Sequence, residues 1–483
     1  MPRRRALLLA VLTLAAALRA IHLDAPILGE HAWRQADTAA MARNFDEGGL
    51  DLLHPRIDWG GVTSGALESE FPLYPFAVAL LYRGLGPDEA WARALSLLLS
   101  LIAIAYLHAL ARATTDDATA LWAAGFLAIL PLSVHFGRAV MPEPLMLAAS
   151  VGGVFHFLIW TRSGRSRHLI ASALLISTAC AVKLPCLYLA VPLLQLAWCR
   201  FGARALLRPA LWAYAAATLA PVLLWYAHAH EIFLETGLTV GIWDPADKFG
   251  SVALVTSAEY WDRIVWVRFA HRLLTWPGFA LFAIGLCLPR RSREEWVFDA
   301  WLAGFAVSLV VVARGHYAHN YYQLPLLFPA VVFMAKPLAR WLHAPASRVP
   351  LRVALAGLVA GVVGTGFAHQ RELLAKEDPS TSPVMTLAEH LAAASEPEDL
   401  VVVTDADPTL LYLAHRKGWR VPLPDLSDAT LGQLRVSGAA FVLGTREHRN
   451  WSDAEESRLV ELGNAHELLW SDTCCFLIRL RGP

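Results

Sequence analysis

A short polar stretch follows the first apolar segment and carries the residue types that acid–base chemistry needs. It reads Gly29-Glu-His-Ala-Trp-Arg-Gln-Ala-Asp37. A carboxylate can take a proton from an attacking hydroxyl or amine, and a guanidinium can hold an anionic group. The catalytic candidates in this stretch are therefore Glu30 and Asp37, and the candidate binding residues are His31 and Arg34.

More acids follow before the next apolar segment begins. Asp58 is a further candidate binding residue, and Glu70 belongs to the same cluster of acids, because Glu68-Ser-Glu-Phe-Pro-Leu-Tyr74 leads straight into an apolar run. An ordinary solvated loop would explain any single acid here, but it explains the cluster less well. Residues 37–45 have helical spacing, which predicts an interfacial helix along the membrane surface.

Two other polar groups stand at the ends of apolar runs. The first pairs Arg138 with Glu143, although the helix dipole alone would favour an acid at this helix start. The second runs from Arg314 to Gln323, and aromatic residues there could equally be interface anchors. Guanidinium, imidazole, amide and phenol groups suit recognition of a phosphate or a sugar. The candidate binding residues of the two groups are Arg138, Glu143, Arg314, His316, Asn320 and Tyr322.

Lys183 interrupts an apolar stretch two residues before Pro185. A lysine at such a position must pair, face water or extend to the interface. We expect a short external turn in which Lys183 holds the phosphate of a lipid-linked substrate, with simple snorkelling as the alternative. No metal site is predicted, because His316 and His319 have no acid nearby in sequence; a divalent cation is retained as an alternative.

The elements that must position these residues are mostly membrane helices. The chain has 483 residues, of which 56% are hydrophobic and 17% charged, whereas about a quarter of a soluble domain is charged. Basic and acidic residues balance at 41 each, so the net charge argues neither for nor against a nucleic-acid partner, and none is predicted. We expect the apolar run from Ala6 to about Leu23 to be a retained first helix. The further predicted spans are about 73–88, 92–112, 118–136, 144–162, 168–182, 185–199, 207–227, 271–288, 297–313, 321–339 and 351–368.

Arginine-rich loops set the predicted orientation, because cytoplasmic loops carry an excess of positive charge. This rule assigns the N-terminus and the loops at 162–167, 200–208, 290–293 and 340–352 to the cytoplasm. The segments assigned to the opposite face are 137–144, 228 to about 266, 314–320 and everything after 370. Three apolar segments between 72 and 137 break the alternation: either one of them is partial or re-entrant (73–88 is short), or one is divided wrongly.

The character of the sequence changes after about residue 370. Strands are predicted at 399–405, 439–443 and 474–480, and helices at 408–417 and near 453–463. Strands alternating with helices predict a small α/β domain, and without a glycine-rich loop we do not assign it nucleotide binding. The predicted fold class is a polytopic α-helical membrane protein with about 11–13 transmembrane helices over 1–370 and an external α/β domain over 371–483. The first external loop, 23–72, carries interfacial helices.

The order of these motifs resembles the polytopic glycosyltransferases of the GT-C superfold. The acids after the first span are followed by Glu70-Phe-Pro-Leu-Tyr74, Arg138-x-x-x-Pro-Glu143, Lys183-x-Pro185 and Tyr321-Tyr-Gln-Leu-Pro-Leu326. The chain is most similar to the dolichyl-phosphate-mannose protein mannosyltransferase and lipid A aminoarabinose transferase group. The resemblance covers roughly residues 1–370, and each motif is weak when taken alone.

The resemblance implies a polyprenyl-phosphate sugar donor and transfer on the periplasmic side, with a carboxylate of the first external loop as general base. Relatives carry an Asp-Glu pair after the first span, and the nearest equivalents here are Glu30-His31 or, slightly later, Asp37. Where relatives often have Lys-Pro-Pro, this chain has Glu70-Phe-Pro, so the resemblance makes Glu70 a third catalytic candidate. Glu143 matches an aspartate of the relatives, and Lys183 matches a lysine in their Lys-Gly-Pro motif.

The leading hypothesis is therefore a glycosyltransferase that moves a hexosyl or pentosyl group to an envelope lipid, glycan or protein. The expected location is the bacterial inner membrane, with a periplasmic C-terminal domain, and the expected partners are the donor, an envelope acceptor and membrane lipid. Two alternatives are kept: a transporter or flippase for a lipid-linked glycan, and a non-catalytic envelope scaffold. A transporter predicts ionisable residues near mid-membrane and repeated broken helices, whereas the charges here lie mainly near span ends.

Overall fold

The computed structural model describes residues 2–243, 248–341, 349–405, 407–445 and 452–481. The chain divides into two compact units. The first contains residues 1–23, 93–229 and 241–372, and the second contains residues 24–92, 230–240 and 373–483. The segment after the first helix thus belongs to the same unit as the C-terminal region. The predicted functional division into 1–370 and 371–483 stays a prediction.

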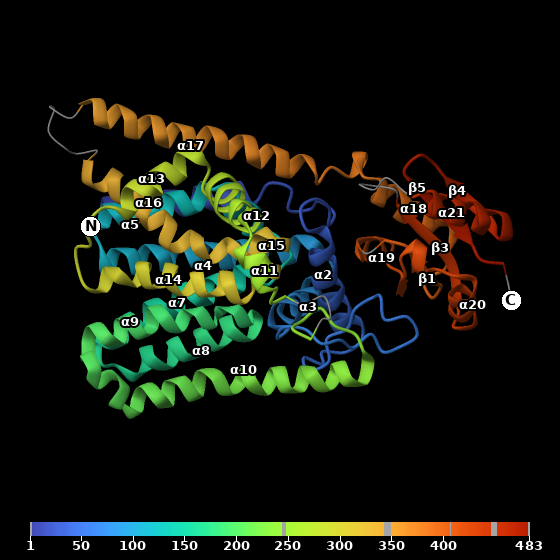
Figure 1. Cartoon of the computed structure of the whole chain (residues 1–483), viewed down its shortest axis with the longest axis horizontal. Helices are drawn as coiled ribbons and strands as arrows, with labels where there is room; N and C mark the ends of the chain where they lie inside the picture. The colour runs from blue at the N-terminus through green and yellow to red at the C-terminus, as the bar shows by residue number, and fades with distance from the viewer. Residues whose placement is uncertain (1, 244–247, 342–348, 406, 446–451, 482–483) are drawn as a thin grey trace. The chain divides into compact units, whose positions relative to one another are not determined.

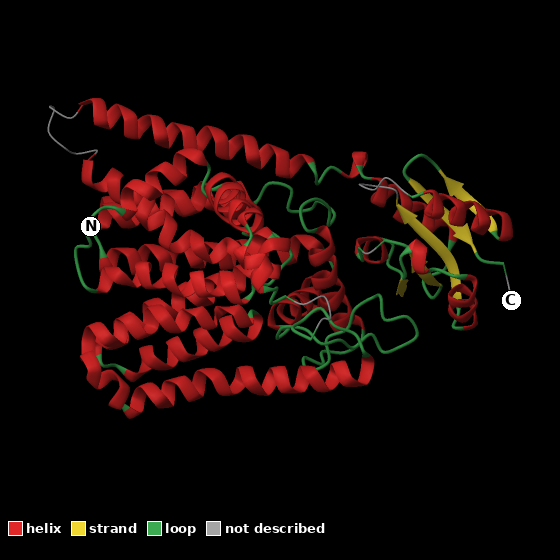
Figure 2. Cartoon of the chain, in the orientation of Figure 1, coloured by secondary structure: helices red, strands yellow, loops and turns green. Residues whose placement is uncertain are grey.

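The first unit is helical, and its long helices lie side by side (Figures 1 and 2). α7 packs on α8, α5 on α16, and α13 on α16. The helices are α1 (Pro2–Arg19), α4 (Glu89–Thr114), α5 (Asp117–Ile129), α6 (Pro131–Phe136), α7 (Glu143–Ser163), α8 (Ser166–Val182), α9 (Ala190–Phe201), α10 (Pro209–Thr236), α11 (Val252–Thr256), α12 (Ala258–Trp261), α13 (Trp276–Leu286), α14 (Val297–Val311), α15 (Ala313–Ala318), α16 (Leu327–Trp341) and α17 (Val349–Ala375). Short 3-10 segments, η1 (Leu184–Leu189), η2 (Gly202–Leu207), η4 (Glu294–Trp296) and η5 (Asn320–Leu326), and a π-helix, η3 (Asp262–Leu273), connect them.

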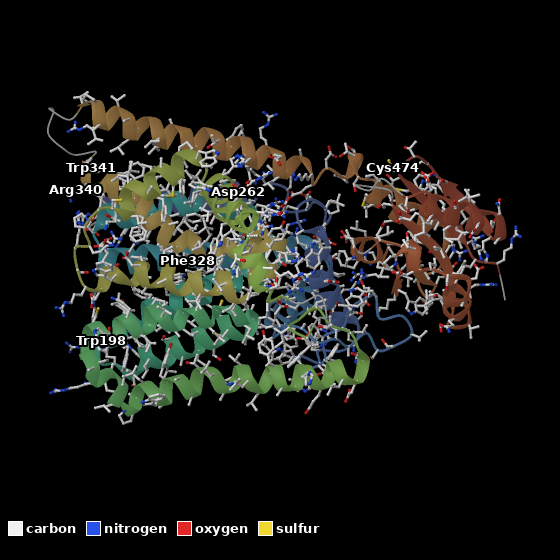
Figure 3. All side chains as sticks on the ribbon, in the orientation of Figure 1. Trp198, Asp262, Phe328, Arg340, Trp341 and Cys474 are labelled. Atoms are coloured by element: carbon white, nitrogen blue, oxygen red, sulfur yellow. The ribbon has the colours of Figure 1, made fainter. Side chains whose placement is uncertain are left out.

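Six helical segments of the described ranges are long and apolar enough to cross a membrane. They are Glu89–Thr114, Glu143–Ser163, Leu184–Leu207, Pro209–Thr236, Asn320–Trp341 and Val349–Ala375. A seventh is formed if Ala258–Leu273 and Trp276–Leu286, bent by 107°, count as one broken span. Buried and exposed side chains of this unit can be compared in Figure 3. Phe328 lies among the helices and is 1% exposed, whereas Trp198 is 58% exposed.

Several predicted spans differ from the helices that form, and each difference has a local cause. The predicted span at 118–136 is broken, because Pro131 lacks the N–H that would continue α5. The predicted start at 271 is wrong, because Thr275 has a positive φ of 64° and α13 begins only at Trp276. α10 extends to Thr236, beyond the predicted end at 227.

The apolar segment that breaks the predicted alternation forms α3 (Leu73–Leu85), a helix of 13 residues in the second unit. At about 1.5 Å per residue this helix is about 20 Å long. The hydrocarbon core of a bilayer is about 30 Å thick. α3 is therefore too short to cross by itself, which favours the interpretation of 73–88 as a partial segment.

The second unit contains α2 (Ala32–Glu47), α3 and a five-stranded sheet of order β2-β1-β3-β5-β4. β1 pairs with β2 and β3 in parallel, and β5 pairs with β3 and β4 in antiparallel. The strands are β1 (Leu400–Val403), β2 (Gly418–Arg420), β3 (Ala439–Thr445), β4 (Glu467–Ser471) and β5 (Cys475–Arg479), and the helices are η7 (Pro379–Thr381), α18 (Pro383–Ala394), α19 (Thr409–Leu413), η8 (Leu423–Asp425), α20 (Asp428–Val436) and α21 (Asp453–Ala465). The predicted fold class, a polytopic helical protein with a small C-terminal α/β region, is confirmed. The predicted number of about 11–13 transmembrane helices is not, because six segments of the described ranges, or seven with the bent pair, are long and apolar enough to cross a membrane.

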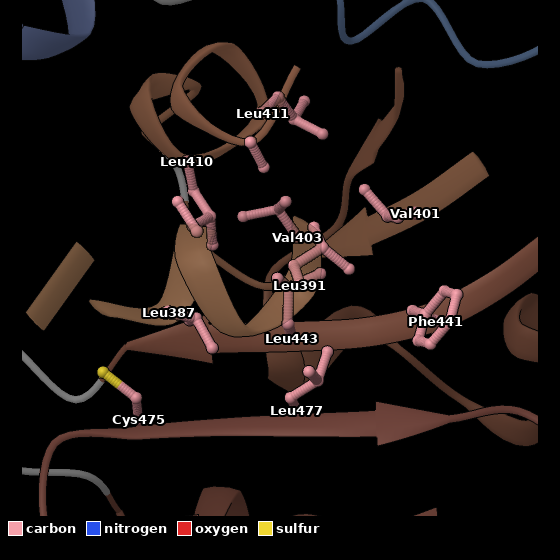
Figure 4. Close-up of a cluster of buried hydrophobic side chains, with 12 residues drawn as sticks. Leu387, Leu391, Val401, Val403, Leu410, Leu411, Phe441, Leu443, Cys475 and Leu477 are labelled. Atoms are coloured by element: carbon pink, nitrogen blue, oxygen red, sulfur yellow. The ribbon is translucent and has the colours of Figure 1, made fainter. Parts of the chain in front are cut away.

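Alternate residues of each strand point to opposite sides of the sheet. Each side is covered by a cluster of hydrophobic residues, so the sheet is buried on both faces. Val401, Val403 and Leu443 pack with Leu387 and Leu391 of α18 and Leu410 and Leu411 of α19 (Figure 4). Val402, Val442 and Ile478 pack on the other face with residues of α20 and α21. The predicted helix at 408–417 is too long, since α19 ends at Leu413 and His415 adopts a positive φ of 53°.

A loop of the second unit attaches to the sheet beside β2. The Gly418 N–H donates to the Asp58 carbonyl at 2.9 Å, and the Gly61 N–H donates to the Gly418 carbonyl at 2.7 Å. Gly61 has a φ of 61°, and a Cβ at this position would lie 2.1 Å from Nε1 of Trp419. Glycine is therefore required for the close approach, and the approach fixes the position of Trp59 within the loop.

Candidate active site

Asp37 is buried in α2 at 2% exposure and has two specific neighbours in the second unit. The Trp59 indole N–H donates to Asp37 Oδ1 at 2.9 Å. The guanidinium carbon of Arg420, on β2, lies 4.8 Å from the centroid of the Trp59 ring. Three segments far apart in sequence thus converge on one carboxylate.

Burial raises the pKa of Asp37 to about 6. The Trp59 hydrogen bond and the charges of Arg420 and Arg34 oppose this rise, and the charge of Asp407 adds to it. General bases work best when their pKa lies near the operating pH. Asp37 therefore combines a defined orientation with the acidity that a proton acceptor needs.

The other two catalytic candidates have different environments. Glu70 forms an ion pair with Arg34, with 2.6 Å between Oε2 and Nη2, and the two side chains are 16% and 6% exposed. Glu30 lies 3.3 Å from Lys376 Nζ in a partly exposed ion pair. His31 precedes α2 with a left-handed backbone, at a φ of 54°. Of the three acids, only Asp37 is both fully buried and oriented by an indole donor.

Asp58 lies in a polar network that joins α2 to the C-terminal region. It is 2% exposed, and its two oxygens accept hydrogen bonds from Arg43 and from Asn44. Arg43 also donates to the Tyr412 carbonyl at 3.1 Å, and Lys417 donates to the Asn44 side chain at 2.8 Å. These contacts favour a structural role for Asp58, whose predicted part in substrate binding stays a prediction.

In the first unit, Glu143 and Lys183 form a buried ion pair. Lys183 Nζ lies 3.0 Å from Glu143 Oε1, and the side chains are 10% and 1% exposed. Glu143 opens α7, and Lys183 stands in an extended conformation between α8 and η1, so the helix is interrupted beside Pro185. No residue of the described ranges donates a hydrogen bond to Glu143 Oε2.

A small pocket surrounds this pair. Lys183 Nζ lies 5.3 Å from the ring centroid of Tyr321 and 5.7 Å from that of Tyr322. The other lining residues are Met146, Pro185, Cys186, Tyr188, Phe305, Ser308, His316 and Pro325. The pocket thus places one ammonium group among aromatic rings and a carboxylate, an arrangement suited to holding an anion beside a polar group.

His316 is a buried, neutral member of this pocket. Its Nε2 lies 3.2 Å from Ser308 Oγ, and its Nδ1 lies 3.2 Å from Gln323 Nε2. Burial and the charge of Arg268 lower the pKa of His316 to about 3. Among the residues that the structure describes, no three or more His, Cys, Asp or Glu side chains form a group that could hold a metal ion.

The remaining binding candidates lie outside the lining of this pocket. Arg138 is buried at 2% exposure, and its guanidinium donates to the His22 carbonyl at 2.8 Å. Arg314 is exposed, and Asn320 is half-buried at the start of η5. The predicted group at 314–323 therefore contributes His316 and Tyr322 to the pocket, but not Arg314 or Asn320.

Sequence reasoning missed Trp59, Arg420 and Tyr321 as site residues. Trp59 could have been found because it stands beside the candidate Asp58 in the acidic loop. Tyr321 could have been found because it stands beside the candidate Tyr322. Arg420 gave no signal, because the three-residue strand that carries it is too short to predict. The predicted residues fall into two groups, with Glu30, His31, Arg34, Asp37, Asp58 and Glu70 in the second unit and Arg138, Glu143, Lys183, Arg314, His316, Asn320 and Tyr322 in the first.

Comparisons with known proteins agree on the architecture. Residues 69–226 match the family described as dolichyl-phosphate-mannose-protein mannosyltransferase. ArnT from Cupriavidus metallidurans in the apo state superposes with a TM-score of 0.68 at 14% identity over 98% of both chains. Its form bound to undecaprenyl phosphate gives 0.65 at 14% identity, over 98% of this chain and 99% of that one. No curated protein sequence matches the chain.

A second type of solved structure shows the same likeness. AglB from Archaeoglobus fulgidus, in complex with an inhibitory peptide and a dolichol-phosphate, has a TM-score of 0.59 at 13% identity. The match covers 91% of this chain and 69% of AglB. The chain therefore has the fold of the ArnT and AglB structures, and over residues 69–226 it is similar to the family described as dolichyl-phosphate-mannose-protein mannosyltransferase.

Proposed function

We propose that this protein is a glycosyltransferase that uses a polyprenyl-phosphate sugar donor at the periplasmic face of a bacterial inner membrane. The observation that carries the proposal is Asp37, a buried carboxylate with a pKa near 6 that is oriented by Trp59. The GT-C fold supports the same activity, since the similar ArnT structure is bound to undecaprenyl phosphate. The acceptor is a hydroxyl or amine of an envelope lipid, glycan or protein.

The proposed reaction is a displacement at the anomeric carbon. The acceptor oxygen or nitrogen forms a bond to this carbon, while the bond from the carbon to the phosphate oxygen breaks. The acceptor proton goes to Asp37, and the bonding electron pair leaves with the lipid phosphate. The transition state has oxocarbenium character, and positive groups stabilise the charge that develops on the leaving phosphate.

We assign phosphate binding to Lys183. Its ammonium group lies in a pocket with Tyr321, Tyr322 and the neutral His316. A lysine in a partly desolvated pocket binds a phosphate as a compact positive charge. In this assignment Glu143 holds Lys183 in place, and the phenol groups can donate to phosphate or sugar oxygens.

The test uses the purified full-length protein with a polyprenyl-phosphate donor labelled in its sugar. We expect the wild type to release lipid phosphate and transfer the label, and Asp37→Asn to lose the activity. Asp51→Asn is the matched control, because Asp51 is an exposed acid in the loop that follows α2. The proposal fails if the wild type consumes no donor while an active related transferase does so under the same conditions.

Two further measurements distinguish the transferase from a flippase and from a scaffold. Movement of labelled lipid across a vesicle bilayer without sugar transfer would indicate a flippase, and full function of Asp37→Asn in cells would indicate a scaffold. Chelation with EDTA tests whether a divalent cation takes part. We expect no loss on chelation, and a loss restored by Mg²⁺ or Mn²⁺ would contradict that expectation.

A further inference from the structure

The C-terminal region supplies a charged side chain beside Asp37. Arg420 stands on β2, the edge strand of the sheet, and its guanidinium carbon lies 4.8 Å from the Trp59 ring centroid. The same ring donates its N–H to Asp37 Oδ1 at 2.9 Å. Trp59 is therefore in contact with the proposed base through its nitrogen and with an arginine through its π face.

Backbone hydrogen bonds hold the loop that carries Trp59 against the strand that carries Arg420. The loop that carries Trp59 is hydrogen-bonded to Gly418, two residues before Arg420, through Asp58 and Gly61. Gly418 is paired in register with Val401 of β1, so the loop and the arginine share one support. Trp59 also packs against the hydrophobic core of the sheet. The indole and the guanidinium consequently keep a fixed relation to Asp37.

The side chain of Arg420 also acts on a second acid of the C-terminal region, because its charge opposes the rise that burial causes in the pKa of Asp407. The Arg420 Nε is buried, and no residue of the described ranges accepts a hydrogen bond from it. A buried donor without a partner costs free energy, so hydrogen bonding of this nitrogen does not account for the position of Arg420. The negative charges of Asp37 and Asp407 do, since Arg420 is among the groups that stabilise both.

We infer that Arg420 is a positioning residue for Asp37 that acts through the Trp59 indole, so that the C-terminal α/β region takes part in proton transfer; this inference rests on the proposed transferase function. A cation over the ring face polarises the indole and strengthens its N–H as a donor. The stronger donor favours the ionised form of Asp37. Arg420 does not touch the substrate in this assignment.

Other charged groups also act on Asp37, and their effects must be distinguished from that of Arg420. Arg34 lies on α2 itself and lowers the pKa of Asp37, whereas Asp407, before α19, raises it. Asp407 is held by the Thr409 N–H, which donates to its Oδ1 at 2.7 Å. Further along α2, Arg43 is engaged by Asp58, Tyr412 and His415. Of these groups, only Arg420 lies over the ring that donates to Asp37.

The experiment measures transferase activity against pH for the wild type, Arg420→Gln and Arg420→Lys. The wild type should lose activity as the pH falls through about 6, the pKa of Asp37. Arg420→Gln should move this acid limb to higher pH by about one unit, a loss of about tenfold at pH 5.5 that disappears near pH 8. Arg420→Lys keeps the charge and should move the limb less.

Matched variants separate positioning from a general effect. Arg479→Gln removes another arginine that lies over an aromatic ring of the same sheet, 5.5 Å from the centroid of Phe441, and should leave the acid limb in place. Trp59→Phe keeps a ring but removes the N–H donor, so it should also raise the limb. Combined with Arg420→Gln, its effect should be less than additive, because both act through one hydrogen bond.

An infrared difference spectrum makes the result independent of turnover. The spectrum of the wild type minus that of Asp37→Asn isolates the protonated carboxyl band of Asp37, whose pH titration should move upward in Arg420→Gln. A titration or acid limb that stays in place in Arg420→Gln, with only the KM for donor changed, would overturn the inference. If the wild type transfers no sugar but the band still moves, the transferase proposal fails and the positioning role of Arg420 stands.

Discussion

At the scale of single residues, environment rather than residue type separates the three candidate bases. Glu30 is in a partly exposed ion pair, Glu70 is paired with Arg34, and Asp37 is buried and accepts an indole hydrogen bond. A buried carboxylate without a full counter-charge holds its proton more tightly than one in water. This physical difference is the reason for assigning proton transfer to Asp37.

Replacing Asp37 should separate activity from stability. We expect Asp37→Asn to lower the transfer rate by about 100-fold or more, because general-base catalysis contributes about 10²–10⁴-fold. Glu30→Gln should retain most activity, because Glu30 lies in a partly exposed ion pair with Lys376. Initial rates at pH 7.5 with saturating donor measure both effects. A larger loss in Glu30→Gln than in Asp37→Asn would reverse the assignment.

The same substitution should stabilise the fold at neutral pH. The folded pKa of Asp37, about 6, is above the ordinary value of 3.8 for an aspartate. The folded state therefore binds more protons than the unfolded state between these values, and stability falls as the pH rises through this window. Asp37→Asn removes the buried charge and should raise the free energy of unfolding by about 1–3 kcal/mol at pH 7.5. Thermal unfolding at pH 4 and 7.5 checks the sign, since the gain should be absent at pH 4.

Lys183 and Glu143 should be tested as a pair. Lys183→Met alone leaves Glu143 buried without its partner and should cost about 3–5 kcal/mol of stability. The double change Lys183→Met with Glu143→Gln should recover much of that stability but still raise the KM for the donor. The matched control is the buried pair Lys336–Glu295, changed to Met and Gln in the same way. An unchanged donor KM in the first double variant would contradict phosphate binding by Lys183.

At the scale of elements, the contact between the 58–61 loop and β2 holds the Asp37 group together. Gly61 and Gly49 both have positive φ angles, 61° and 84°, but only at Gly61 would a Cβ meet a neighbour, the Trp419 side chain. Gly49→Ala should therefore cost about 1 kcal/mol from backbone strain alone. Gly61→Ala should cost more, because Trp419 must move as well.

The extra displacement of Trp419 in Gly61→Ala should loosen only the 58–61 loop and its contact with β2. We expect limited proteolysis to cut the 58–61 loop faster in Gly61→Ala than in Gly49→Ala, and the acid limb of activity to rise only in the former. Equal proteolysis rates in the two variants would show that the loop does not depend on its contact with Trp419.

At the scale of the whole molecule, the predicted topology can be tested by chemical labelling. A variant without the six native cysteines carries a single cysteine at Asp51, at Arg165 or at Asp472, three positions that lie in loops. In intact cells, an impermeant thiol reagent that reaches the periplasm should label positions 51 and 472. It should label position 165 only after the membrane is opened. Labelling of position 165 in intact cells would overturn the predicted orientation.

Much of the local structure follows directly from the order of residue types along the chain. Apolar runs near 20 residues predicted most of the helices, and the strands β1, β3 and β5 and the helix α21 formed close to their predicted positions. These features depend on the spacing of residues within a dozen positions. β2 and β4 were missed, because β2 has only three residues and β4 is half-exposed at the edge of the sheet.

Which of the candidate residues lie in contact depends on the packing of distant segments. Asp37 on a helix and Trp59 in a loop are 22 positions apart, and Arg420 on a strand lies more than 300 positions further along the chain, so no local pattern reports their contact. Likewise, the pairing of Glu143 with Lys183 depends on how α7 and α8 pack. Periodicity within a segment encodes which face is apolar, whereas burial and partners, which set the acidity of a carboxylate, arise only when distant segments meet.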